Sequence, residues 1–300
     1  MSRYWPMLLT LAAVWGASYL FIKDAVDEIE PAPMMAVRAL LAAAVLLGYV
    51  VWRFGRARAF AELAAAWRHC AVLGVFNAAL PFWLIAWGEQ HIDSGLAAVV
   101  QASVPIFNAL LVLRFLPHER LSRTRALGLA IGIAGVAVVT GIHPDGGGLA
   151  ILGALAVVLS SVLYASAGVY GQRAVSGTAG PVLAAGSMLV GGLLLAPFAL
   201  LQLPSSVPSL EATASVLALS LLGTALAQLI LFRMLALYGS ARLSLVTYLM
   251  PAFALAYGAL LLDEAITAAT VAALALILGG VALASGVVRL RRSETLSVRP

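Results

Sequence analysis

Long apolar segments alternate with short polar ones along almost the whole chain. Ten of them lie near the roughly 20 residues that a helix needs to cross the hydrocarbon core of a bilayer. They cover residues 5–22, 33–52, 70–88, 94–115, 122–141, 149–171, 181–201, 213–237, 241–262 and 266–288. Their length, without alternating polarity, favours helices over barrel strands. The pattern therefore predicts an all-α integral membrane protein with ten transmembrane helices.

The chain contains an internal repeat. Residues 94–141 recur, with one residue deleted, as residues 240–286. Identical residues mark the alignment, with an offset of 146 up to the proline and 145 from the glutamate onward: Ser94 and Ser240, Pro105 and Pro251, Glu119 and Glu264, Gly135 and Gly280, Gly141 and Gly286. Each copy holds two apolar segments, so the repeat predicts two halves of five helices. We expect these halves at residues 1–145 and 146–290, followed by a tail at 291–300.

Basic residues gather on one side of the predicted membrane. When the segments alternate in direction, 16 of the 18 Lys and Arg residues fall on the side of the N-terminus, and only Lys23 and Arg38 lie near the other. By the positive-inside rule, the basic side is cytoplasmic and holds both termini. Because each half has an odd number of helices, the second half enters the membrane from the opposite side. Such inverted five-helix repeats are typical of secondary transporters that work by alternating access.

Composition narrows the class of protein. The chain is 63% hydrophobic and 10% charged, with a mean hydropathy of +1.02, which is more apolar surface than a soluble core of 300 residues can bury. The basic loops account for the pI of 9.7, so no nucleic-acid partner is predicted. The single cysteine, Cys70, excludes an intrachain disulfide. The expected partners are the lipid bilayer and a small-molecule substrate; the oligomeric state stays open, and a monomer is compatible with the sequence.

Polar and aromatic side chains at mid-depth in the first, third, fourth, sixth, eighth and ninth predicted helices indicate a binding cavity. An unpaired amide facing lipid is costly, so such groups are expected to face protein or a water-filled cavity. The residues expected to bind substrate are Trp15, Asn77, Trp83, Gln101, Asn108, Tyr164, Gln228 and Tyr248. The residues expected to break helices and assist gating are Pro81, Pro105 and Pro251. For each amide, an interhelical hydrogen bond without a substrate role is the open alternative.

Charged side chains are nearly excluded from the predicted helices. Arg38 and Glu89 lie closest to their interior, and we interpret both as boundary residues. Without a central carboxylate, proton-driven antiport of lipophilic cations is disfavoured, and without a central Lys or Arg, sugar phosphates and nucleotides are disfavoured. A neutral, zwitterionic or amphipathic metabolite fits better. No Ser, His and Asp set and no metal-binding cluster lies at one depth, so the sequence predicts no enzyme, metal site or cofactor.

Three motifs carry a resemblance to a known family: W-G-A-S-Y-L-F-I-K at residues 15–23, P-A-P-M-M-A-V-R-A-L at residues 31–40, and the doubled segment with its proline, glutamate and glycines. In their order along the chain, these motifs resemble the EamA-type drug/metabolite transporter superfamily, and the likeness covers nearly the whole chain. The resemblance implies a ten-helix carrier of the bacterial inner membrane, many relatives of which export amino acids or other metabolites. In the small multidrug relatives a first-helix glutamate carries proton coupling, whereas this chain has no acidic residue before Asp24. Proton coupling by that route is therefore not expected.

The sequence thus predicts a secondary transporter that exports amino acids or similar small neutral or zwitterionic metabolites by alternating access. A multidrug or quaternary-ammonium effluxer of the same superfamily is the alternative within this class. A passive channel or a membrane-embedded enzyme is the alternative from another class. Saturable flux with counterflow would mark a carrier, whereas non-saturating conductance would mark a pore.

Overall fold

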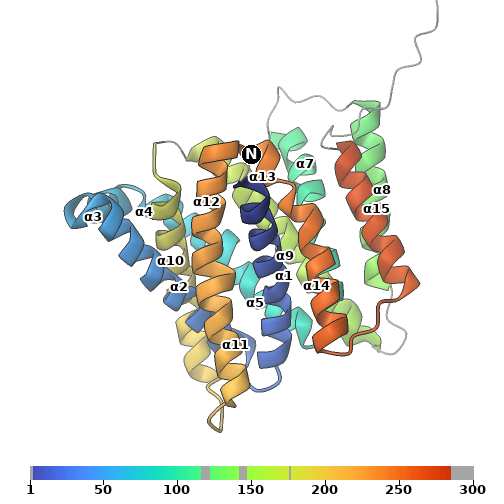
Figure 1. Ribbon diagram of the computed structural model, residues 1–300, viewed down its shortest axis with the longest axis horizontal. Coiled ribbons are helices and arrows are strands. Elements are labelled where there is room, and N and C mark those ends of the chain that lie inside the picture. Colours follow the sequence, from blue (N-terminus) through green and yellow to red (C-terminus); the bar gives the residue numbers. More distant parts are fainter. Residues whose placement is uncertain (1–2, 116–121, 142–146, 176, 285–300) are drawn as a thin grey trace, which may run out of the picture.

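The computed structural model is helical throughout the part of the chain that it describes, residues 3–115, 122–141, 147–175 and 177–284 (Figure 1). The α-helices and the two π-helical segments, labelled η, are α1 Tyr4–Ala25, α2 Pro31–Phe54, α3 Arg56–Ala65, α4 Trp67–Gly74, η1 Val75–Ala79, α5 Leu80–Glu89, α6 Ser94–Gln101, α7 Val104–Phe115, α8 Arg123–Gly141, α9 Gly147–Ala174, α10 Gly180–Leu201, α11 Leu210–Ser220, η2 Leu221–Leu226, α12 Ala227–Tyr238, α13 Ser240–Leu243, α14 Val246–Leu261 and α15 Ala268–Ala284.

Helices long and apolar enough to span a membrane make up most of the described chain. Eight continuous runs qualify there, and three of them combine shorter elements: Trp67–Glu89 joins α4, η1 and α5, Ser94–Phe115 joins α6 and α7, and Leu210–Tyr238 joins α11, η2 and α12. The apolar helices α14 and α15 are shorter. Each of the ten predicted segments coincides with one of these runs, so the prediction of an all-helical, multi-pass membrane protein is confirmed. The predicted tail and two residues of the repeat, Glu119 and Gly286, lie outside the described residues.

One helix, α3, is not predicted by the hydropathy pattern. It follows α2 and projects from the bundle (Figure 1). It carries Arg58 and Glu62, whose Nε and Oε1 atoms lie 2.7 Å apart, and it exposes Phe60. Its charges make it too polar to cross a bilayer, but a short amphipathic helix of this kind suits the membrane interface.

Small residues let the last helix pack closely on α8. Gly128 and Gly132 form a GxxxG motif, which predicts such packing. A Cβ atom added to Gly280 of α15 would lie 2.5 Å from the Gly132 nitrogen and 2.6 Å from the Gly128 oxygen. The two helices therefore touch backbone to backbone, at one side of the bundle (Figure 1).

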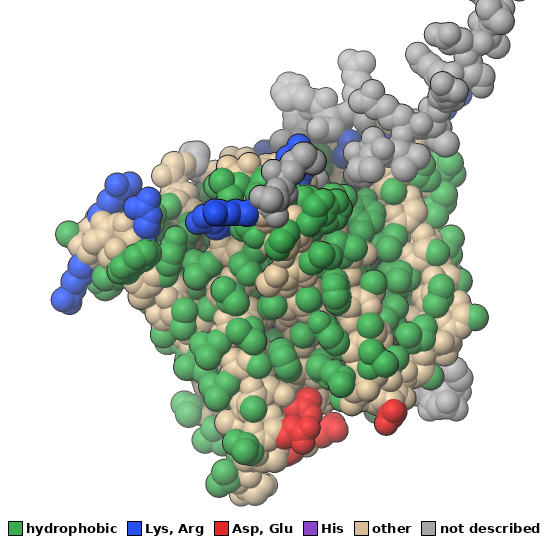
Figure 2. Space-filling view, in the orientation of Figure 1, with side chains coloured by type: hydrophobic (Ala, Val, Ile, Leu, Met, Phe, Trp, Pro, Cys, Tyr) green, Lys and Arg blue, Asp and Glu red, His purple; other side chains and the backbone are tan. Residues whose placement is uncertain are grey.

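The surface divides into two charged ends and an apolar belt. Figure 2 shows Lys and Arg side chains at the end where α1 begins, Asp and Glu side chains at the opposite end, and hydrophobic side chains between them. Large apolar side chains are exposed along this belt; Leu193, for example, exposes 57% of its surface. A contiguous apolar surface of this kind has lipid as its natural environment.

Candidate functional site

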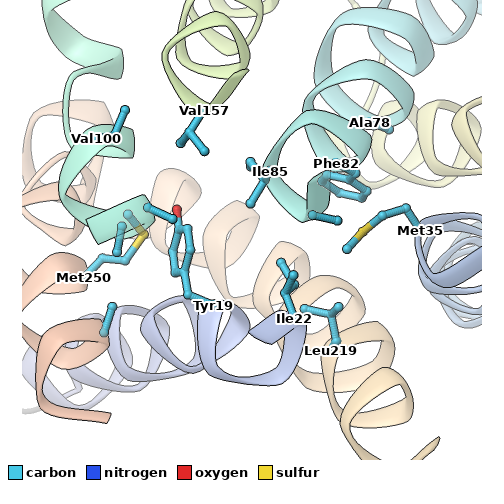
Figure 3. Close-up of a cluster of buried hydrophobic side chains, with 14 of the residues drawn as sticks. Tyr19, Ile22, Met35, Ala78, Phe82, Ile85, Val100, Val157, Leu219 and Met250 are labelled. Atoms are coloured by element: carbon cyan, nitrogen blue, oxygen red, sulfur yellow. The ribbon is translucent and has the colours of Figure 1, made fainter. Parts of the chain in front are cut away.

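A cavity of about 450 Å3 lies among the helices. Its volume falls within the roughly 300–1,000 Å3 of typical small-molecule sites. Its lining residues are Trp15, Ser18, Tyr19, Ile22, Arg38, Asn77, Phe82, Ile85, Gln101, Val104, Tyr164, Gly223, Thr224, Gln228, Leu231, Phe232, Thr247 and Met250. The six predicted cavity segments all contribute, and α2 adds Arg38. Figure 3 shows part of this wall, where Tyr19, Ile22, Phe82 and Met250 lie around a common space.

Five of the eight residues that the sequence predicts to bind substrate line this cavity: Trp15, Asn77, Gln101, Tyr164 and Gln228. Gln101 Oε1 accepts a 2.8 Å hydrogen bond from Ser160 Oγ of α9, which holds the amide against that helix. The side chains of Asn77 and Gln228 form no hydrogen bond within the described residues, so neither amide is occupied by another helix. These polar groups are therefore available to a ligand.

The other three candidates lie away from the cavity because of their position around or along a helix. Trp83 follows Phe82, so it is turned by about 100° from the cavity. Its ring stacks on Trp87 with centroids 6.5 Å apart. Tyr248 follows the lining residue Thr247 in the same way, and its buried hydroxyl has no partner among the described residues. Asn108 lies one turn beyond the lining residue Val104, past the end of the cavity.

Two π-helical segments shape the wall of the cavity. A π turn adds a residue to the helical repeat and is frequent at functional sites. η1 contains Asn77, and η2 contains Gly223 and Thr224. Thr224 Oγ1 donates a 3.0 Å hydrogen bond to the Leu219 carbonyl, five residues earlier. Both distortions thus turn polar or small residues toward the cavity, and the sequence pattern gives no sign of either.

Of the three prolines predicted to break helices, two follow irregular backbone. Pro81 is the second residue of α5 and comes after η1, and Pro105 is the second residue of α7 and follows the interruption between α6 and α7. Pro251 lies inside α14, which continues through it, so the predicted helix break at this residue is absent. The chain breaks earlier, between α13 and α14.

The lining residues include pairs with the spacing of the sequence repeat. Six pairs are separated by 146 positions, the offset of the first part of the repeat: Ser18 and Tyr164, Asn77 and Gly223, Phe82 and Gln228, Ile85 and Leu231, Gln101 and Thr247, Val104 and Met250. The start of η1 at Val75 and the start of η2 at Leu221 show the same spacing. Residues at this spacing therefore face one cavity.

Arg38 is a cavity residue that sequence reasoning missed. It is only 7% exposed, its Nε donates a 2.9 Å hydrogen bond to Thr224 Oγ1, and its guanidinium carbon lies 3.8 Å from the centroid of the Phe82 ring. The interpretation of Arg38 as a boundary residue is wrong, and so is the expectation that the site lacks a cationic group. A charge inside an apolar span is the signal that could have identified it.

Hydrogen bonds join two helices at the acidic end of the bundle. Lys23 Nζ donates hydrogen bonds to the carbonyls of Glu89, at 2.8 Å, and Ile92, at 3.1 Å, which ties α1 to the end of α5. Glu89 is the last residue of α5, as expected for a boundary residue, but its side chain is fully buried and neither of its oxygens has a hydrogen-bond partner in the described structure. Across the described residues, no three His, Cys, Asp or Glu side chains gather as they would around a metal ion.

Comparisons with known proteins agree on one family. The EamA-like transporter family matches residues 4–141 and 151–286. An "Uncharacterized transporter" of Archaeoglobus fulgidus is 27% identical over 288 residues, which are 93% of this chain and 97% of that protein. The "Uncharacterized inner membrane transporter YedA" of Escherichia coli (strain K12) is 30% identical over 158 residues, 52% of this chain and 48% of that protein, about half its length.

Two further matches bear on activity and fold. The "Probable terminal-alkyne amino-acid exporter" of Streptantibioticus cattleyicolor is 30% identical over 138 residues, 45% of this chain and 43% of that protein. A solved crystal structure has a TM-score of 0.68 with 22% sequence identity and covers 97% of this chain and 99% of the other. At that identity the structural match shows the shared fold alone.

Proposed function

Because the chain belongs to the EamA-like transporter family, we propose that it is a secondary transporter that carries a small metabolite through its central cavity by alternating access. The observation that carries this proposal is the cavity of about 450 Å3, lined from both halves of the chain by polar and aromatic side chains. Trp15 and Tyr164 would form its aromatic walls, and Asn77, Gln101 and Gln228 would orient polar groups of the substrate.

The architecture that we propose is two inverted five-helix repeats, residues 1–145 and 146–290, followed by a cytoplasmic tail. Three observations support it. The family matches two successive ranges of the chain, lining residues pair at a spacing of 146, and basic and acidic side chains gather at opposite ends (Figure 2). With the basic end cytoplasmic, both termini are cytoplasmic. The inner-membrane location named for the Escherichia coli relative supports a bacterial inner membrane.

Amino acids or similar small zwitterionic metabolites are the substrates that we propose. The relative named as an amino-acid exporter supports this class. No carboxylate belongs to the described residues that line the cavity, and this makes efflux of quaternary ammonium compounds the weaker alternative.

Counterflow in proteoliposomes tests the function and the site together. We expect saturable counterflow of amino acids, and a non-saturating conductance would instead indicate a channel. Gln101→Leu should lower the flux with little loss of stability, because Ser160 Oγ keeps its 2.8 Å hydrogen bond to the Val157 carbonyl. Asn108→Leu makes the same side-chain change outside the cavity and serves as the matched control. Equal loss in both variants, or loss in neither, would contradict this location of the site.

A further inference from the structure

We propose that Arg38 binds a carboxylate group of the substrate, so that the cavity selects amphipathic acids, including amino acids. This inference rests on the proposed transport function and deepens it by assigning the substrate class to one residue. It reverses the expectation, drawn from the sequence, that no cationic group takes part in recognition.

The first step is the placement of the guanidinium. Its Nε is held by Thr224 of η2 at 2.9 Å, and the ring of Phe82 covers one face at 3.8 Å. Its Nη1 lies 3.7 Å from the Met35 sulfur, a weak acceptor, and Nη2 has no hydrogen bond within the described residues. One strong bond and one stacking contact therefore fix the orientation of the group and leave donors for a ligand.

The second step is the missing counter-charge. Arginine stays protonated in proteins, and a buried cation without a partner is costly. Arg38 is more than nine-tenths buried and forms no ion pair with any described residue. The buried Glu89 does not line the cavity and forms no ion pair with Arg38. The positive charge therefore remains uncompensated at the cavity wall until an anion arrives.

The third step is the chemistry of the rest of the cavity. Arg38 is the charged side chain among the described lining residues, so no acid competes with an incoming anion. A guanidinium offers two parallel N–H donors, which match the two oxygens of a carboxylate. Trp15, Tyr19 and Phe82 supply apolar surface for the body of the ligand, and the amide oxygens of Asn77 and Gln228 can accept from an ammonium group. An amphipathic acid satisfies all of these groups at once.

A purely structural role would account for less of this geometry. The bond to Thr224 uses one of the five N–H donors of the guanidinium. A neutral donor would suffice to brace η2 through Thr224, whereas the residue that lines the cavity here is cationic. The two roles differ in one measurable quantity, which is the ratio of the binding affinities for a carboxylic acid and for the corresponding neutral amide.

Binding of 3-phenylpropionate and 3-phenylpropanamide, which differ only in charge and in one atom of the head group, tests the inference. Affinities are measured from the ligand-dependent rise in the unfolding temperature of the purified, full-length protein. We expect the wild type to bind the acid at least tenfold more tightly than the amide. Arg38→Gln should remove this preference, and Arg38→Lys should restore part of it. Arg53→Gln, an exposed change on the same helix, should leave it intact.

Several outcomes would overturn the assignment. These are equal binding of acid and amide by the wild type, binding of neither, tighter binding of 2-phenylethyl phosphate than of the acid, or an unchanged preference in Arg38→Gln. If Arg38→Gln fails to fold, the wild-type comparison alone decides. Counterflow of the amide but not of the acid would refute the role of Arg38 while leaving transport standing. Selective binding of the acid without counterflow of any probe would refute transport while leaving the role of Arg38 standing.

Discussion

Glu264, in the link between α14 and α15, holds the start of α6 through its carboxylate. The Ser94 backbone nitrogen donates to Oε1 at 2.7 Å, and Ser94 Oγ and the Gly95 nitrogen donate to Oε2 at 3.0 and 2.9 Å. Asp93 occupies the capping position of α6, but its side chain makes no capping bond. Glu264 therefore supplies, from across the bundle, the acceptor that the first N–H groups of a helix need.

Replacing Glu264 with alanine should cost about 3 kcal/mol of unfolding free energy. A hydrogen bond to a charged group contributes about 1.5–3 kcal/mol, and the three bonds here share one partly exposed carboxylate, so we take a total at the upper end of the range for a single bond rather than the sum of three. Ser94 is fully buried, so its N–H would lose its acceptor without gaining water. Gly258→Ala should act in the same direction, because its new Cβ atom would lie 2.2 Å from Glu264 Oε2.

Unfolding by sodium dodecyl sulfate in mixed micelles, followed by tryptophan fluorescence, measures this loss. Glu264→Gln should lose less than Glu264→Ala, because one oxygen remains while an NH2 group replaces the other opposite an N–H donor. Asp263→Asn is the matched control: it removes a charge from the adjacent residue, whose φ of 54° asparagine tolerates. If Glu264→Ala is no less stable than Asp263→Asn, the capping argument is wrong.

Three further predictions use other contacts. Glu89→Gln should leave the unfolding free energy unchanged, because neither Glu89 oxygen accepts a hydrogen bond in the described structure, and a loss as large as that of Glu264→Gln would contradict this. Gly280→Leu should reduce the yield of monodisperse protein in size-exclusion chromatography by forcing α8 and α15 apart, whereas Gly279→Leu, with nothing within 4 Å of its added Cβ, should not; equal yields would argue against the close contact. Hydrogen bonds from Ser209 lower the pKa of Glu28, so they stabilise the fold above the unfolded pKa of this carboxyl, and that contribution is lost as pH falls through its folded value. The difference in unfolding temperature between wild type and Ser209→Ala should therefore shrink between about pH 7 and pH 3, and a constant difference would count against it.

Hydropathy predicted the helices well because the bilayer itself imposes their length and their apolar character. The segment predicted at residues 122–141 is α8, Arg123–Gly141, to within one residue. α3 was not predicted because its charged residues lower the hydropathy of an amphipathic helix. η1 and η2 were not predicted because a one-residue shift in backbone hydrogen bonding does not change the composition of a segment. Depth along a helix was therefore predictable, whereas local backbone distortion was not.

The sequence predicted how deep the candidate residues lie in the membrane, but not which side of its helix each residue occupies. Trp83 and Tyr248 lie at the depth of the cavity yet point elsewhere, because each is one residue out of phase with a lining neighbour. From the sequence, Arg38 is interpreted as a boundary residue because it lies close to the end of its predicted segment. Only the packing of Phe82 and Thr224 around it shows that it belongs to the cavity.

The pairs of lining residues spaced by 146 positions explain how the proposed inverted repeats could hold an asymmetric ligand. At the proposed equivalent positions the backbone distortion is kept, but Asn77 is replaced by Gly223, where an added Cβ would lie 2.6 Å from Ser18 Oγ, and Phe82 is replaced by Gln228. The first half thus brings the aromatic ring that stacks on Arg38, and the second half brings an amide. A substrate with one anionic end would bind in one orientation, although two proposed repeats enclose it. Exchanging the pair, as Phe82→Gln with Gln228→Phe, should therefore weaken acid binding even though the composition of the cavity is unchanged, and undiminished binding of 3-phenylpropionate would show that the pairs do not set its orientation.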